Sequence, residues 1–141
     1  MKKSLFIIPF IFLFACTGQH KKLNEIIEKS TKVEIYVSVK DSAQTELKIY
    51  ESSDPVRIKE FENYFTDKHT QNYKYSYTGK IVFKNSEKDV NVMFNLKPES
   101  THIAYMIGFT LYTMNLSEKG LDYLKTITAN IPIQPVQQHK E

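Results

Sequence analysis

The side chains most able to do chemistry are few and widely spaced. The chain of 141 residues has one cysteine, Cys16. Its four histidines stand far apart, at His20, His69, His102 and His139. None of them has the spacing of a metal-binding motif. A site of His69 and His102 with Asp67 would need folding to bring them together, and solvated loop histidines are the simpler interpretation. We therefore predict no metal and no cofactor.

Motifs of the common catalytic folds are also missing from the sequence. It contains no Gly-x-Ser-x-Gly elbow, no glycine-rich phosphate loop and no His-Glu-x-x-His helix. Its carboxylates fall in predicted turns or on outer helix faces, where Glu60 and Glu62 would diverge. The sequence favours a protein that is not an enzyme. A hydrolase that uses carboxylates not marked by any motif, or His69 and His102, stays open as an alternative.

The single cysteine ends an apolar N-terminal segment. Two lysines, Lys2 and Lys3, precede an apolar run from Leu5 to Ala15. Eleven residues are too few for a membrane-spanning helix, which needs about 20. A run of this length behind positive charge is typical of a secretory signal peptide.

The residues Leu13-Phe14-Ala15-Cys16 resemble a bacterial lipobox, although Phe14 stands where a small residue is usual. The resemblance implies a thioether-linked diacylglyceryl group on Cys16, cleavage after Ala15 and acylation, with palmitate among the chains, of the new amine. Two or three acyl chains hold a protein firmly in a bilayer, whereas one holds it marginally. An ordinary secretory signal with a free Cys16, and an uncleaved anchor, are the alternatives.

The residues after Cys16 bear on location. In lipoproteins of diderm bacteria, an aspartate directly after the cysteine retains the protein in the inner membrane. Here that position is Thr17, and no acidic residue occurs between Cys16 and Glu25. The composition and the Asp-Pro and Leu-Ser-Glu-x-Gly helix starts resemble those of small Bacteroidota lipoproteins over residues 33–127. The resemblance implies the periplasmic face of the outer membrane and carries no activity.

Composition describes an ordinary globular chain. It is 41% hydrophobic and 25% charged, which argues against disorder and collagen. Loss of residues 1–15 removes two lysines and no acidic residue, so the formal charge falls from +3 to +1. We therefore predict no nucleic-acid partner.

Hydrophobic periodicity predicts the elements that must position any site. Alternation predicts strands over 33–39, 46–50, 73–83 and 90–96, and residues 101–114 predict two more, divided at Gly108. Helical spacing predicts a short helix over 23–30. Caps at Asp54 and Ser117 predict helices over 54–65 and 117–129.

This order predicts an α+β fold, a two-layer sandwich. It has an antiparallel sheet of about five to six strands with two main helices on one face. We expect a lipoprotein signal peptide over 1–15, a tether and short helix over 16–31, a single domain over 32–130 and a C-terminal tail over 131–141.

Aromatic residues suggest one binding surface. Tyr73, Tyr75 and Tyr77 alternate on one strand and would share a face with Ile81 and Phe83. Burial under a helix is the simpler interpretation. Exposed, they would form a surface for a protein or glycan, since tyrosine is enriched at interfaces.

The sequence is compatible with three functions. The first is a lipid-anchored envelope protein that binds another protein as an inhibitor, an immunity protein or an accessory subunit. The second is a small-ligand carrier with a pocket between sheet and helices. The third is the envelope hydrolase. The carrier's pocket would be lined by five side chains: Phe61, Phe65, Met93, Phe94 and Phe109.

Overall fold

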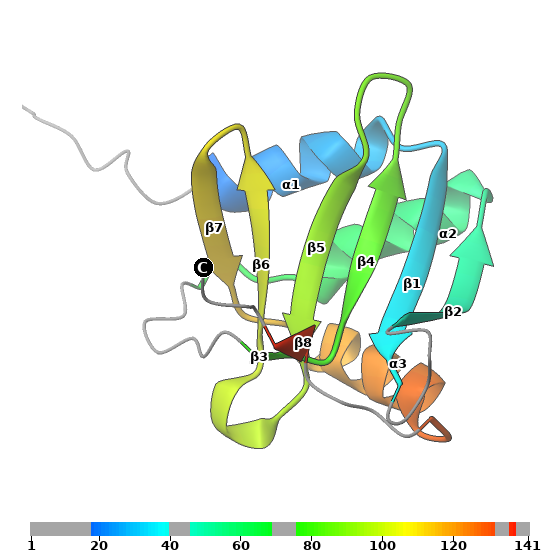
Figure 1. Cartoon of the computed structure of the whole chain (residues 1–141). Coiled ribbons are helices and arrows are strands. Elements are labelled where there is room, and N and C mark those ends of the chain that lie inside the picture. Colours follow the sequence, from blue (N-terminus) through cyan, green and yellow to red (C-terminus); the bar gives the residue numbers. More distant parts are fainter. Residues whose placement is uncertain (1–17, 40–45, 69–75, 132–135, 138–141) are drawn as a thin grey trace, which may run out of the picture.

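A computed structural model describes residues 18–39, 46–68, 76–131 and 136–137 (Figure 1). Several residues of interest therefore lie outside the described parts: Cys16, His69, Tyr73, Tyr75 and His139.

Within these parts, six antiparallel strands form one open sheet in the order β2-β1-β4-β5-β6-β7. A two-stranded pair, β3 with β8, lies in front of its lower end in Figure 1. The strands are β1 Lys32–Ser38, β2 Glu46–Ser52, β3 Ser76–Tyr77, β4 Gly79–Lys84, β5 Val90–Asn95, β6 His102–Ile107, β7 Thr110–Met114 and β8 Val136–Gln137.

The described α-helices all lie behind the six-stranded sheet (Figure 1). They are α1 Gly18–Glu28, α2 Pro55–Glu60 and α3 Glu118–Thr128, with 3₁₀ turns η1 Phe61–Tyr64 and η2 Pro98–Ser100. The α+β two-layer prediction is confirmed, with α1 as a third helix on the same face. None of the described helices is both long and apolar enough to cross a bilayer.

The alternation along each strand decides which face the helices cover. In β1 the side chains of Val33, Ile35 and Val37 are fully buried. Register places these three beside Phe83, Ile81 and Gly79 of β4. Because side chains alternate across a strand, the even-numbered residues of β1 face the other way. We refer to that uncovered side of the sheet as the open face.

Side-chain caps start two of the helices as predicted. The Asp54 carboxylate accepts a hydrogen bond from the Val56 amide at 2.9 Å, and Pro55 occupies the first turn. The Ser117 hydroxyl accepts from the Gly120 amide at 3.0 Å and donates to the Asn63 carbonyl at 2.7 Å. The cap of α3 therefore also holds that helix against η1.

The structure differs from three local expectations. Residues 18–22, expected as tether, form the first turns of α1, whose Leu23 and Ile27 are buried on the body. The expected tail contains β8, which pairs with β3. The expected strand 73–83 is interrupted by a bend at Thr78, and residues 73–75 are outside the described parts.

The bend reverses the side on which Tyr77 lies. The Tyr77 ring packs edge-on against His102, at 5.7 Å between centroids, on the open face. Ile81 and Phe83 instead lie in the core under the helices. The change occurs at Thr78, whose backbone forms hydrogen bonds to both flanking strands. Its amide donates to the Phe94 carbonyl of β5, and its carbonyl accepts from the Ser38 amide of β1.

The contact between α3 and η1 generates a stability prediction. A Cβ at Gly120 would lie 2.3 Å from the Tyr64 carbonyl oxygen and 2.8 Å from its Cα. Helix propensity alone would favour Gly120→Ala by about 1 kcal/mol. We expect the clash to prevail and to lower the free energy of unfolding by about 2–3 kcal/mol, measured by urea denaturation.

Gly18→Ala is the matched control, because nothing lies within 4 Å of a Cβ built there. It should leave the free energy of unfolding unchanged within about 0.5 kcal/mol. Equal stability of the two variants would contradict the packing described for α3.

Candidate functional site

The two described histidines, His20 and His102, contact different groups and do not lie together as metal ligands would. His102 is fully buried at the start of β6, and its Nδ1 donates to the Ser100 carbonyl at 2.7 Å. Asp67 lies 3.4 Å from His20 Nδ1. In the described parts, no three or more His, Cys, Asp or Glu side chains gather as metal ligands would. His69 lies outside those parts.

The predicted tyrosine surface is not present at its described member. Tyr77 is only 2% exposed, so its side chain cannot belong to an exposed aromatic strip. The interruption at Thr78 explains this, because it turns Tyr77 onto His102. Tyr73 and Tyr75 lie outside the described residues, and their part of the prediction stays a prediction.

The five side chains predicted to line one pocket lie in three places. Phe61, Phe65 and Phe94 are buried in the core. Met93 points to the open face, opposite Ala104 of β6. Phe109, at the tip of the β6–β7 hairpin, is fully exposed. The alternation of β5 puts Met93 and Phe94 on opposite sides, so this predicted pocket is wrong.

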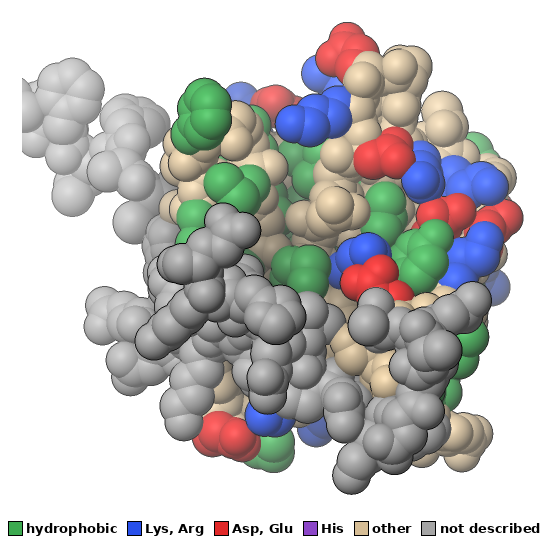
Figure 2. Space-filling view, viewed as in Figure 1, with side chains coloured by type: hydrophobic (Ala, Val, Ile, Leu, Met, Phe, Trp, Pro, Cys, Tyr) green, Lys and Arg blue, Asp and Glu red, His purple; other side chains and the backbone are tan. Residues whose placement is uncertain are grey.

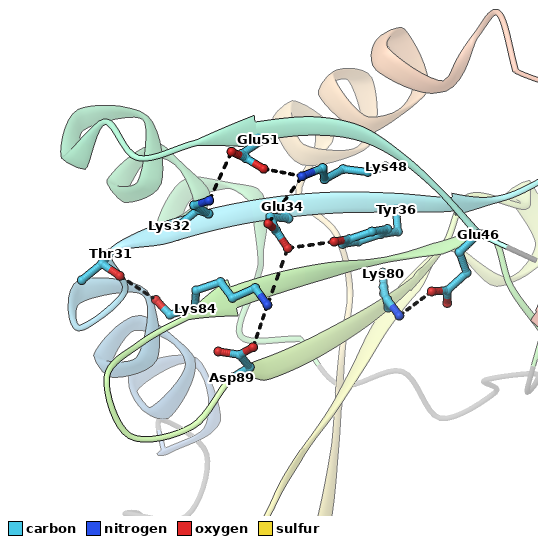
Figure 3. A network of polar contacts seen from close by, with 10 residues as sticks. All are labelled: Thr31, Lys32, Glu34, Tyr36, Glu46, Lys48, Glu51, Lys80, Lys84 and Asp89. Carbon is cyan, nitrogen blue, oxygen red and sulfur yellow. Dashed lines mark hydrogen bonds and ion pairs between the residues drawn. The ribbon is translucent and has the colours of Figure 1, made fainter. Parts of the chain in front are cut away.

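A network of charged side chains covers one half of the open face, over β1, β2 and β4 (Figures 2 and 3). At its centre the Glu34 carboxylate, 8% exposed, accepts a hydrogen bond from the Tyr36 hydroxyl at 2.8 Å. The ammonium groups of Lys48 and Lys84 each lie 3.7 Å from it. Glu34 is therefore compensated by two positive charges.

The rest of this network is paired in the same way. Lys48 and Lys32 both contact Glu51 and lower its pKa to about 2. The hydrogen bond to Glu34, with burial, raises the pKa of Tyr36. These shifts favour a negative Glu51 and a neutral Tyr36 at neutral pH.

The other half of the open face contains a notch where two strands separate. The β5–β6 ladder ends at the pair Val92–Tyr105, although β5 begins at Val90 and β6 runs on to Ile107. The cavity there has a volume of about 620 Å³. Figure 2 shows this region between the two upper hairpins as a recess with hydrophobic side chains in it.

The lining of the notch has an apolar floor and a charged rim. Ile26 of α1, Met93 and Ala104 contribute to the floor. The rim carries both signs of charge: Lys22, Glu25, Lys29, Glu87, Lys88 and Asp89. Tyr105 adds no acid or base, because burial raises its pKa and its hydroxyl donates to the Gln19 carbonyl at 2.9 Å. The notch therefore presents apolar side chains and charges of both signs to whatever enters it.

Sequence reasoning missed the notch because its walls come from three segments distant along the chain. The one local signal was the charge-free stretch 101–114, of which residues 106–111 are exposed in the structure. A scan of known protein families, of curated proteins and of solved structures found no match to the chain.

His102 generates a prediction about pH. Burial lowers its pKa below the ordinary value of 6.5, against the opposing hydrogen bond to Ser100. The unfolded chain then binds a proton at a higher pH than the folded chain. Stability from this residue is complete above pH 6.5 and is lost as the pH falls below it.

We therefore expect the urea midpoint of the wild type to fall between about pH 7 and pH 5 more steeply than that of His102→Gln. Circular dichroism at each pH would supply both curves. The readout is the slope, so a uniform loss of stability in the variant does not affect it. Parallel curves would show that His102 does not contribute.

Proposed function

We propose that this protein is a lipid-anchored envelope protein that binds another protein and catalyses no reaction. The motif Leu13-Phe14-Ala15-Cys16 behind a short apolar run supports the anchor. The absence of an acidic residue between Cys16 and Glu25 supports the periplasmic face of the outer membrane.

The notch is the observation that carries the binding role. Beyond Val92 and Tyr105 the two strands continue without pairing with each other, and each pairs there only with its other neighbour, β4 or β7. An extended peptide segment can pair with such strand ends while its side chains contact an apolar floor. The rim supplies charges of both signs on either side, which would select the partner and its orientation.

The pairing of ionisable groups supports a role without catalysis. Among the described carboxylates, Glu34 and Glu51 contact lysines, and Glu60 lies 3.2 Å from Arg57. Charge pairs of this kind, the nearly buried one at Glu34 and the exposed ones at Glu51 and Glu60, are ordinary structural features. The proposed binding therefore relies on shape and backbone pairing.

The volume of the notch favours a small-ligand carrier as a second candidate. Ligand pockets measure about 300–1,000 Å³, and about 620 Å³ falls within that range. We place the protein partner first because the notch lies between two hairpin ends and has a charged rim, whereas a carrier encloses its ligand.

Metabolic labelling with a palmitate analogue tests the anchor. We expect incorporation into the wild type and none into Cys16→Ser, because the thiol is the attachment point. Mass spectrometry of the purified wild type should show the chain beginning at an acylated Cys16. An unmodified thiol, or residues 1–15 still attached, would refute the proposed anchor.

Site-specific photo-crosslinking in cells tests the notch. A benzophenone amino acid at Asn91, which lines the notch, should give one discrete protein adduct. The same group at Val56, 68% exposed on α2, is the matched control and should give none. The Asn91 adduct should be lost when Met93→Glu is added, because the charge disrupts the apolar floor.

Equal adducts at both positions, or an adduct that Met93→Glu leaves intact, would argue against the notch. Native mass spectrometry that shows a bound small molecule, with no protein adduct at Asn91, would favour the carrier.

A further inference from the structure

The tip of the β6–β7 hairpin exposes apolar side chains in one continuous stretch. Of the six large hydrophobic residues exposed in the described parts, four lie here. The exposed fractions of these four side chains are 56% for Met106, 37% for Ile107, 103% for Phe109 and 42% for Leu111. Single exposed apolar residues are common, but a contiguous group indicates a surface that something covers.

The turn itself is unusual for a hairpin in water. Gly108 has φ 60°, which supplies the positive angle that a tight turn needs. The next position, normally Asn, Asp, Ser or Gly, is Phe109. The backbone explains Gly108, but nothing in the turn geometry calls for a phenylalanine beside it.

The start of helix α1 lies against the same two strands. The Tyr105 hydroxyl of β6 donates to the Gln19 carbonyl at 2.9 Å. Lys22 Nζ donates to the Tyr112 hydroxyl of β7 at 2.8 Å and lies 4.9 Å from that ring's centroid. In Figure 1, α1 accordingly begins behind the upper half of β7, near the hairpin turn.

Covalent geometry brings the anchor to this end of the molecule. Cys16 precedes Gly18, the first residue of α1, by two residues, so their Cα atoms are at most about 7 Å apart. Phe109 is three residues from Tyr112, about 10 Å along a strand. A lipid on Cys16 and the apolar tip would therefore meet the same bilayer surface.

We propose that the β6–β7 hairpin tip, residues 106–111, inserts into the interface of the membrane that holds Cys16. This inference rests on the proposed lipid anchor. Aromatic and aliphatic side chains gain free energy at the boundary of headgroups and acyl chains. Lys21 and Lys22, both exposed in the first turns of α1, add attraction to anionic headgroups.

Insertion would fix the orientation of the protein. Attachment at Cys16 alone leaves the body free to rotate about one point, whereas a second contact at the hairpin prevents that rotation. The notch, one wall of which is this hairpin, would then open beside the membrane. Its protein partner would be one located at the same membrane.

The test uses two features of the sequence: it has one cysteine and no tryptophan. The chain from Cys16 to Glu141, which includes every described element, is coupled through Cys16 to a maleimide lipid in phosphatidylethanolamine–phosphatidylglycerol vesicles. Phe109→Trp reports on the tip, and Val56→Trp, also highly exposed, is the matched control. Chemical coupling makes the result independent of acylation in the cell.

We expect the emission of the Phe109→Trp protein to shift to shorter wavelength on the vesicles. Acyl chains brominated near the headgroup should quench it at least about twofold more strongly than the control. Equal quenching of the two, or no shift, would overturn the proposal. A shift without vesicles that grows with protein concentration would also overturn it and assign the tip to a second copy of the chain. Failure of palmitate labelling, in contrast, would refute the anchor and leave this measurement unaffected.

Discussion

The one-sided burial of the sheet is the constraint on which the rest of the structure depends. Three helices and the 3₁₀ turn η1 cover the face that carries Val33, Ile35 and Phe83. Aromatic rings pack together there: Phe61 of η1 meets Phe83 edge-on at 5.6 Å, and Tyr64 of η1 stacks on Tyr123 of α3 at 4.9 Å. Because strand side chains alternate, every residue that packs into this core leaves a neighbour on the open face. The open face must satisfy its own polar groups, and the two halves of the sheet do so differently.

Over β1, β2 and β4 the open face is occupied by charges that compensate one another. Glu34 is nearly buried among neighbours of its own network, so the cost of removing it from water is offset by two lysines and the Tyr36 hydroxyl. Over β5 to β7 the sheet instead opens into the notch, with its apolar floor and charged rim, beside a hairpin tip whose apolar side chains are exposed in the described structure. One half of the open face thus has its charges paired, whereas the other half exposes the notch and the apolar hairpin tip. The proposed anchor at Cys16 precedes the helix that packs on this second side.

Much of the fold was predictable because its determinants are local. The core positions of Val33, Ile35 and Val37 in β1, the caps at Asp54 and Ser117 and the division at Gly108 were all predicted and are confirmed. The failures occurred where a local pattern was overridden by contacts from elsewhere. Tyr77 continues the alternation of Tyr73 and Tyr75, but the backbone bonds of Thr78 to β1 and β5 reverse its side. Similarly, 18–22 is too polar to predict a helix on its own, yet its ends pack against Tyr105 and Tyr112.

The sequence by itself determined the period of each strand, the starts of two helices and the place of a lone cysteine behind a short apolar run. These follow from neighbouring residues, since side-chain alternation, capping and the length of an apolar segment are properties of a few consecutive positions. Only the tertiary structure decided that β5 and β6 separate above Val92 and Tyr105, that Glu34 lies between Lys48 and Lys84, and that Phe109 projects from the end of the molecule where α1 begins. Each of these depends on which strands become neighbours and in what register, and that is set by the packing of residues far apart in the chain.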